Sequence, residues 1–301
     1  KPVHIVVDRE HTMASDLIER LETQSEYKGV FVSAEDAMIM CDFNTLLIVV
    51  DVNRPAYVES ESLLQSINKV AVIDHHRRAA DYIENAVVSL HEPYASSASE
   101  LVSELLQYLV PTSSILTAEA EAMLSGIYLD TKGFSTRTGV RTFEAAAALR
   151  RYGAETERVR QLFDVTMVEY NAKADLVEAA QMYRNCAISV SGEVPPEARV
   201  AIAQAANDLL TIQNVEASFV AVQVGSGVNI SARSLGAVNV QVIMESLGGG
   251  GHQTMAAAQL KHITPEAARA RIQTAIDQYR ESQKKPLSKN EPESRKKEKQ
   301  G

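Results

Sequence analysis

Two rhythms of apolar and polar positions alternate along the first half of the chain. Continuous apolar runs of strand length occur at residues 3–8, 45–52, 69–74 and 86–91, and helical spacing occurs near 13–23 and from about 98 onward. Short continuous apolar runs separated by helices are typical of strands buried on both faces of a parallel sheet. The pattern therefore predicts an α/β domain with a doubly wound, mostly parallel sheet.

Helical patterns then continue through the middle of the chain. Ser97 and Glu100 have capping-box spacing, so a helix is expected to start there. Further helices are predicted at 117–130, 141–152 and 155–183, and the last is long enough to connect two domains.

The pattern changes after about residue 184. Alternating runs at 185–192, 218–225 and 227–236 predict strands, and 198–210, 237–247 and 265–281 predict helices. The sequence VGSGV between two of the strands is typical of a tight hairpin. We therefore expect a first domain at 1–154, a helical linker at 155–183, a smaller α+β domain at 184–281 and a disordered basic tail at 282–301.

Composition fits two globular domains, with 301 residues of which 45% are apolar and 23% charged. The tail 282–301 has seven Lys and Arg against three Glu, a charge of +4. Because the whole chain carries −9, residues 1–281 carry −13. Such an acidic body argues against a long nucleic-acid partner. A small anionic substrate would need a metal ion or a local cationic pocket.

Cysteine usage and the length of the apolar runs indicate the cellular compartment of the chain. Cys41 and Cys186 form no CxxC pair, which favours a reducing compartment. No apolar run is long enough to cross a bilayer, and no signal peptide is recognisable. The chain begins with Lys1 rather than Met, which favours a piece of a longer protein.

Candidate chemistry gathers where the predicted strands end. Asp51 and Asp74 each close an apolar strand, His75 and His76 follow directly, and Asp130 ends a helical stretch. The carboxyl ends of parallel strands meet at one edge of a sheet, where ligands bind. A single strand-end aspartate is more simply a helix cap. The mixed Asp/His set together favours a site for divalent cations.

Such a site suits phosphoryl chemistry in an acidic protein. Two cations roughly 4 Å apart clamp a phosphate and lower the pKa of a water molecule toward neutrality. The cations would also supply the positive charge that the protein lacks.

These residues resemble a known family. VIDHH after VVD, with Asp130 downstream and GGGGH (248–252) before MAAAQ, resembles the DHH/DHHA phosphoesterase superfamily. DHHRR, EPYASSASELVSELL and RSLGAVNVQVIMESLGGGGH are most similar to its GdpP-type (YybT-type) cyclic-di-AMP phosphodiesterases. The resemblance implies hydrolysis of cyclic-di-AMP to linear pApA by a metal-activated water in an interdomain cleft.

The resemblance also implies roles for the first-domain residues. Asp51 would bridge two metal ions, expected to be Mn²⁺, and His75 and Asp130 would be further metal ligands. Asp74 would orient its neighbours, and His76 would face the scissile phosphate.

In the second domain the resemblance implies a substrate grip. Gly249, Gly250, Gly251 and His252 would cradle the substrate, because glycines let backbone N–H groups approach a phosphate closely. Arg233 would hold a phosphate or a base. A flexible turn is the alternative interpretation of the glycine run.

One departure from the family concerns its first motif, H-x-x-x-D-x-D. This chain has His4, Asp8 and Glu10 at a similar spacing, but His4 lies inside a predicted strand. We interpret this match as a decoy and expect the true motif about one strand–helix unit upstream. The chain would then hold only part of the two-metal site.

Two other functions stay open from the sequence. One is a nanoRNA or pApA exonuclease of the same superfamily, and the other is a regulatory module that binds a cyclic dinucleotide without turnover. The resemblance further implies a homodimer, and a cytoplasmic domain of a parent protein that is anchored to the bacterial plasma membrane.

Overall fold

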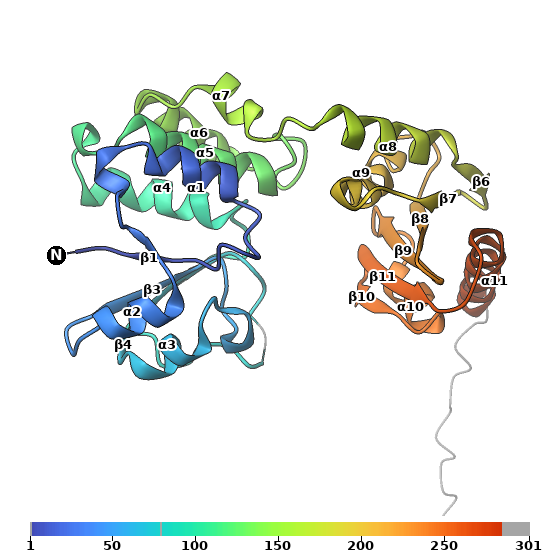
Figure 1. Cartoon of the computed structure of the whole chain (residues 1–301), viewed down its shortest axis with the longest axis horizontal. Helices are drawn as coiled ribbons and strands as arrows, with labels where there is room; N and C mark the ends of the chain where they lie inside the picture. Colours follow the sequence, from blue (N-terminus) through green and yellow to red (C-terminus); the bar gives the residue numbers. More distant parts are fainter. Residues whose placement is uncertain (1, 79, 285–301) are drawn as a thin grey trace, which may run out of the picture. The chain divides into compact units, whose positions relative to one another are not determined.

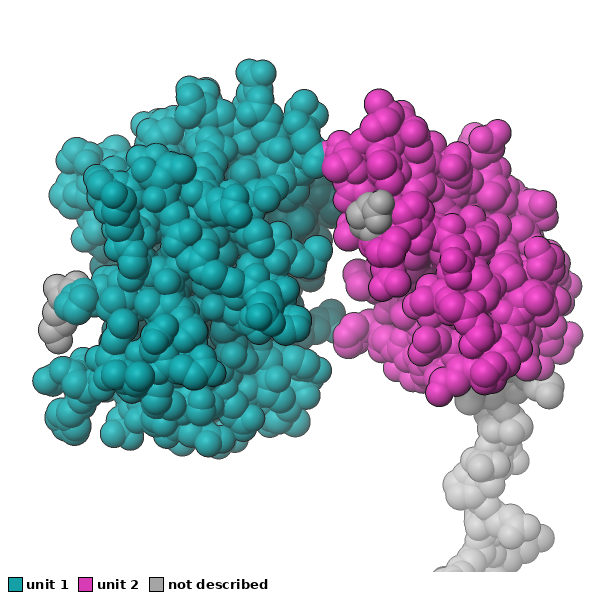
Figure 2. All heavy atoms as spheres, in the orientation of Figure 1, with its two compact units in different colours: residues 1–164 teal, residues 165–301 magenta. Residues whose placement is uncertain are grey.

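The computed structural model describes residues 2–78 and 80–284, and the chain divides into two compact units after Asp164 (Figures 1 and 2). Each unit has its own strands and its own buried core. Among the described residues, no helix is both long and apolar enough to span a bilayer.

The first unit is a parallel α/β fold, as the apolar runs predict. Its main sheet has the strand order β3–β4–β5, and β1 and β2 form a separate parallel pair. The five strands are β1 (Ile5–Val6), β2 (Phe31–Val32), β3 (Leu46–Val50), β4 (Lys69–Asp74) and β5 (Val88–His91).

Helices cover these strands on both sides (Figure 1). On one side lie α2 (Ala34–Met40) and α3 (Glu61–Ser66), whose Ala37 and Leu63 pack with Val6, Val32 and Leu47. The other side carries α1 (Ser15–Glu22), α4 (Ala98–Leu109), α5 (Thr117–Asp130), α6 (Val140–Arg151) and α7 (Thr156–Gln161). α5, α6 and α7 share a core of their own.

Strand β3 is unusually exposed for its composition. Its alternate residues Leu46, Ile48 and Val50 are 51%, 56% and 51% exposed, whereas Val49 on the opposite face is buried. Among the described residues β3 pairs with β4 alone. An apolar strand with an open edge is an aggregation hazard that folded proteins normally cover. Among the described residues, the edge of β3 that leads to Asp51 therefore has no strand paired to it.

The second unit is a six-stranded mixed sheet in the order β10–β11–β9–β8–β7–β6. Only β7 and β8 run parallel; the other neighbours are antiparallel. The strands are β6 (Gln181–Tyr183), β7 (Cys186–Glu193), β8 (Ala217–Val224), β9 (Gly227–Ser234), β10 (Gly250–His252) and β11 (Met255–Leu260). β8 and β9 form the predicted hairpin, and Gly225 has the positive φ of 56° that such a turn requires.

Two pairs of helices bury the faces of this sheet. α8 (Met167–Glu178) and α9 (Val200–Leu209) pack on one face through Leu176, Ala205 and Val220. α10 (Val240–Ser246) and α11 (Pro265–Lys284) pack on the other around Phe219 and Ile272.

The expected helix at 155–183 is wrong. It consists of α7, α8 and strand β6, because a new capping box interrupts it: Thr166 accepts from Glu169 N, and the Glu169 carboxylate accepts from Thr166 N. Residues 181–183 pair with the start of β7 instead of continuing α8. The expected disordered tail lies mostly outside the described residues, and α11 reaches Lys284.

Candidate metal centre

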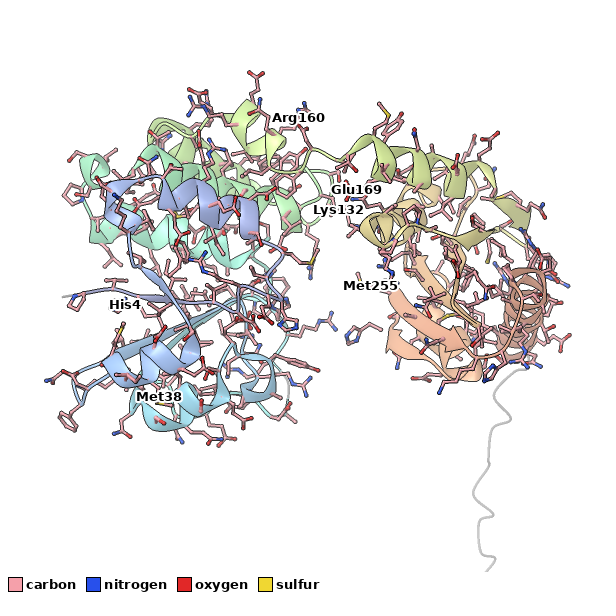
Figure 3. All side chains as sticks on the ribbon, viewed as in Figure 1. His4, Met38, Lys132, Arg160, Glu169 and Met255 are labelled. Atoms are coloured by element: carbon pink, nitrogen blue, oxygen red, sulfur yellow. The ribbon has the colours of Figure 1, made fainter. Side chains whose placement is uncertain are left out.

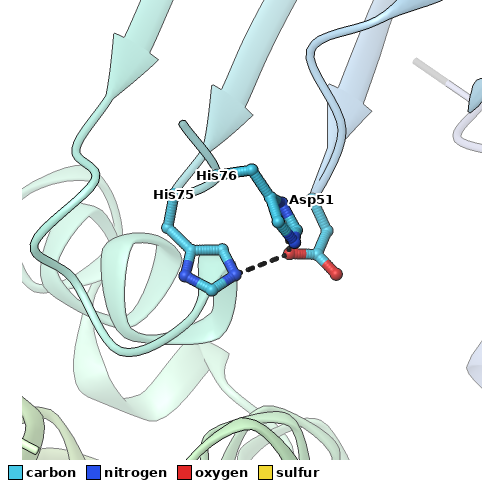
Figure 4. Close-up of side chains that lie close together, drawn as sticks. All are labelled: Asp51, His75 and His76. Carbon is cyan, nitrogen blue, oxygen red and sulfur yellow. Dashed lines mark ion pairs between the residues drawn. The ribbon is translucent and has the colours of Figure 1, made fainter. Parts of the chain in front are cut away.

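The candidate metal centre lies where the parallel strands of the first unit end (Figure 4). Asp51 follows β3 and Asp74 closes β4, with His75 and His76 next in the chain. Asp51 has a positive φ of 63°, while its N–H still donates to Ile73 O at 2.9 Å. Left-handed backbone costs most residues about 1–2 kcal/mol, although aspartate tolerates it better than most. The chain therefore turns away from the sheet at Asp51, directly after β3, and the Asp51 carboxylate lies at the strand end.

His75 is buried, with its side chain 2% exposed, and both ring nitrogens have defined partners. Nδ1 lies 3.2 Å from the carbonyl oxygen of Ala95, which can only accept, so Nδ1 carries the proton. Nε2 lies 3.2 Å from Asp51 Oδ1 and 3.5 Å from Asp130 Oδ2. In the neutral ring the Nε2 lone pair therefore faces two carboxylates, the arrangement expected of a metal ligand.

Asp130 reaches this place from the end of α5. The loop after it contains four residues with positive φ: Lys132, Gly133, Phe134 and Arg137. Buried Thr131 holds the loop, because its carbonyl accepts from Ser135 N and Thr136 N and its hydroxyl from Phe134 N. A loop tied at so many points fixes the direction of the carboxylate that precedes it.

His76 and Asp74 form a second arrangement beside the first. Asp74 is fully buried and its Oδ1 lies 2.8 Å from His76 Nδ1, whereas the His76 side chain is 54% exposed. Asp74 Oδ2 accepts from Asn53 Nδ2. The imidazole of His76 is thus held at Nδ1, which leaves Nε2 for a ligand.

Burial, hydrogen bonds and nearby charges shift the pKa values of Asp74, His75 and Asp130. Burial would raise the pKa of the Asp74 carboxyl, but hydrogen bonds from His76 and Asn53 outweigh it and lower the pKa. The hydrogen bond to Asp51 raises the pKa of His75, helped by Ala95 O and the charge of Asp130 and opposed by burial. Burial and the nearby Asp51 charge raise the pKa of Asp130. Without a cation, carboxylates and imidazole thus compete for protons at one place.

The donor set fits a divalent cation. One donor atom each from Asp51, His75 and His76 lies within 4.8 Å of the others, and Asp130 stands beside His75. Mixed carboxylate and imidazole donors suit divalent metals of intermediate hardness. In the described part of the chain, neither His4 nor Asp8 belongs to this group, and Asp8 Oδ2 pairs with His11 at 2.7 Å.

Arg233 in the second unit is an uncompensated cation. Its Nη1 donates to Ser231 Oγ at 3.1 Å and to Ala232 O at 2.9 Å, and its Nε is buried without a hydrogen-bond partner. Burial lowers the pKa of the guanidinium. Within residues 2–78 and 80–284 no carboxylate forms an ion pair with it, so the group is suited to an incoming anion.

The glycines beside Arg233 have different reasons for being glycine. A Cβ on Gly249 would lie 2.1 Å from Ala257 O, and a Cβ on Gly251 would lie 2.5 Å from Met255 O. Both therefore permit the close packing of β11. Gly250 has open space at that position, and it alone of the three predicted cradle glycines has no packing reason to lack a side chain.

His252 shares a row with Arg233 across three strands. His252 pairs with Met255, and Met255 pairs with Arg233, so the three side chains project from the same face of the sheet. Met255, labelled in Figure 3, is 51% exposed, and His252 is exposed as well. The predicted first-unit residues thus come together at one place, whereas Arg233 and His252 share one face of the second unit's sheet with Met255 between them.

Sequence reasoning missed Asn53 and misread Glu100. Asn53 carries no motif signal, because its role depends on a contact with Asp74 across two strand ends. Glu100 was expected to complete a capping box. Ser97 Oγ does accept from Glu100 N, but the carboxylate of Glu100 is buried and accepts instead from Ser96 and Thr142. It thereby ties down the segment whose Ala95 carbonyl holds His75.

Known proteins resemble both units of this chain. Residues 3–127 match the model of the DHH family, N-terminal domain, and residues 196–282 match that of the DHHA1 domain. The cyclic-di-AMP phosphodiesterase GdpP of Geobacillus thermodenitrificans is 45% identical over 93% of this chain and 43% of its own length. The cyclic-di-AMP phosphodiesterase PdeA of Listeria monocytogenes is 41% identical over 89% of this chain and 41% of its own.

A solved structure shares the fold. An exopolyphosphatase-related protein from Bacteroides fragilis superposes with a TM-score of 0.70 at 18% identity, over 88% of this chain and 82% of its own. The present chain spans about two fifths of the length of the curated relatives named above.

Proposed function

This chain belongs to the DHH/DHHA1 phosphoesterases, and from that premise we propose that it is the catalytic part of a metal-dependent phosphodiesterase that hydrolyses cyclic-di-AMP to linear pApA. The observation that carries the proposal is the meeting of Asp51, His75, His76 and Asp130 at the strand ends. The similarity to GdpP and PdeA supports the choice of substrate.

The metal ions would be held by Asp51, His75 and Asp130, and we propose Mn²⁺ because the donors mix oxygen with imidazole nitrogen. When bound, such ions screen the charge of the phosphodiester and activate water as a nucleophile. Asp51 is 55% exposed against 31% for Asp130, so its carboxylate is the more accessible of the two, and it would bridge the ions as the family resemblance implies.

Other predicted site residues, in both units, would handle the substrate. His76 keeps Nδ1–H on Asp74, so in its imidazolium form the outward Nε2–H can donate to a phosphoryl oxygen or protonate the leaving 3′ oxygen. Arg233 can hold a second phosphate through its guanidinium. The backbone at Gly250 is open to a close approach, and His252 is exposed next to it. That all these groups act on one substrate molecule stays a prediction.

Further ligands are expected from a segment preceding Lys1, and the open edge of β3 beside Asp51 supports this because a further strand can pair there. A homodimer, and a parent protein that places this domain in the cytoplasm at the plasma membrane, remain predictions of the resemblance.

Cyclic-di-AMP hydrolysis with Mn²⁺ tests the function directly, in this chain and in one extended upstream by a strand and a helix. Asp51→Ala or His75→Ala should lower turnover roughly a thousandfold in whichever chain is active, and Asp16→Ala on the exposed surface should leave it unchanged. A preference for linear pApA over the cyclic substrate would instead indicate an exonuclease. Tight binding of cyclic-di-AMP without turnover in either chain would indicate a regulatory module.

A further inference from the structure

Asn53 lies directly behind the DHH triplet but is outside the proposed ligand set. Asn53 is buried, with 6% of the residue exposed, and its backbone carbonyl accepts from Ile83 N at 2.8 Å. The side-chain amide donates from Nδ2 to Asp74 Oδ2. The residue is therefore fixed by its backbone on one side and aimed at a buried carboxylate on the other.

The Asp74 carboxylate divides its two oxygens between two side chains. Oδ1 accepts from His76 Nδ1 at 2.8 Å, and Oδ2 accepts from Asn53. A carboxylate rotates easily about its last bond, so donors at both oxygens are needed to hold its plane. Because Asp74 can only accept when ionised, His76 must carry its proton at Nδ1.

The other end of the Asn53 amide is not satisfied. Oδ1 is buried and has no hydrogen-bond partner among the described residues. A buried amide oxygen without a donor is unfavourable, and native structures contain few of them. An apolar residue of similar size would avoid this cost but would leave the buried Oδ2 of Asp74 without a donor. The donation to Asp74 therefore explains an amide here.

We propose that Asn53 is a positioning residue that acts through Asp74 on His76. Asn53 holds the plane of the Asp74 carboxylate, Asp74 holds Nδ1–H of His76, and Nε2 of His76 stays directed outward toward the phosphate. The consequence for catalysis rests on the proposed function, whereas the consequence for the imidazole does not.

A double-mutant cycle tests the catalytic consequence, in the chain that shows Mn²⁺-dependent turnover. Asn53→Leu removes the donor at similar volume and should lower kcat about 10- to 100-fold, as loss of such outer partners does, with little change in KM. Asp74→Asn breaks the same path, so adding Asn53→Leu to it should cost nothing further. Asn68→Leu makes the same exchange at an exposed site of the same unit and should leave kcat unchanged.

Two results would overturn the proposal. One is a kcat of Asn53→Leu within twofold of the wild type. The other is a double variant whose fold-reduction in kcat equals the product of the fold-reductions of Asn53→Leu and Asp74→Asn. Should the Leu variant fail to fold, Asn53→Ser and Asn53→Ala replace it. The two are close in size, but only serine has a donor, so equal kcat values for this pair contradict the proposal.

Nitrogen NMR of histidine-labelled chain tests the imidazole without metal, substrate or turnover. In the wild type the neutral His76 ring should carry its proton at Nδ1. In Asn53→Leu, or in Asn53→Ala if the Leu variant does not fold, the ring should be a mixture of the Nδ1–H and Nε2–H tautomers. Unchanged ring-nitrogen shifts in that variant would contradict the proposal. Absence of wild-type turnover would count against the proposed function, while this NMR result still decides the role of Asn53.

Discussion

The two units use their sheets in opposite ways. The first gathers carboxylates and imidazoles at the ends of parallel strands, around Asp51 and His75. The second presents a guanidinium, Arg233, on the face of a mixed sheet and gives it no carboxylate partner among the described residues. One arrangement needs cations and the other needs an anion. A phosphodiester with its metal ions satisfies both, so catalysis and substrate binding should be separable by mutation.

The sheets also differ in how completely they are covered. In the second unit both faces pack against helices, whereas β3 of the first unit leaves Ile48 and Val50 more than half exposed. The metal centre adjoins the less covered of the two sheets. We therefore expect metal binding at this centre to change when the chain is extended upstream or when ions are added. The fold of the second unit should change less under the same conditions.

The largest effect should come from the ligands of the first unit. Asp51→Ala or His75→Ala should lower kcat roughly a thousandfold, because metal ions contribute several kcal/mol to the transition state. Calorimetric titration should show weakened Mn²⁺ binding in the same variants. Wild-type Mn²⁺ affinity in both would contradict the ligand assignment, and Asp16→Ala is the control.

Loss of the cation in the second unit should act on binding. Arg233→Ala should raise KM for cyclic-di-AMP about 10- to 100-fold, because a hydrogen bond to a charged group contributes about 1.5–3 kcal/mol. Mn²⁺ affinity should stay unchanged. Arg271→Ala, on the exposed surface of α11, should leave KM as it is. A fall in kcat with constant KM would place Arg233 in the chemical step instead.

Acid should weaken metal binding at the first unit. The hydrogen bond to Asp51 raises the pKa of His75, so this ring keeps its proton to a higher pH than a free histidine. A cation must displace that proton, and Mn²⁺ affinity should therefore fall about tenfold per pH unit below this pKa. Titrations between pH 5.5 and 8.5 measure it. An affinity that is independent of pH would exclude His75 as a ligand.

The smallest effect distinguishes packing from substrate contact among the glycines. Gly249→Ala should lower the free energy of unfolding by about 1–3 kcal/mol, because the added methyl group meets Ala257 O and the side chain of Ala258. Gly250→Ala should leave stability nearly unchanged and raise KM. Urea unfolding and steady-state kinetics of both variants provide the comparison. Equal stabilities would show that β11 yields to the extra methyl.

The strand ends and their side chains could be read from the sequence because they lie on continuous apolar runs. Asp51 and Asp74 close such runs, and parallel strands bring their ends together. The chemistry of the second unit was readable only through family resemblance, because Arg233 and His252 are placed on one face only by the cross-strand pairing of both with Met255. Register between distant strands leaves no local signal.

Other features stayed hidden because tertiary contacts decide them. Strand β2 and helices α2 and α3 are too short to show a clear hydrophobic period in the sequence. They adopt regular secondary structure because they pack against Leu47 and Val6. Glu100 matched a capping box, yet its carboxylate turned inward to Thr142 on α6, 42 residues away. The helix start was therefore predictable, and the support that it gives to His75 was not.

The most direct test of the central claim is Mn²⁺-dependent conversion of cyclic-di-AMP to pApA. It is measured on this chain and on one extended upstream by a strand and a helix, each with Asp51 intact or replaced by alanine. The account predicts hydrolysis that requires Mn²⁺ and Asp51 and that is faster in the extended chain. Hydrolysis at an undiminished rate in Asp51→Ala, or no hydrolysis in either intact chain, would contradict it.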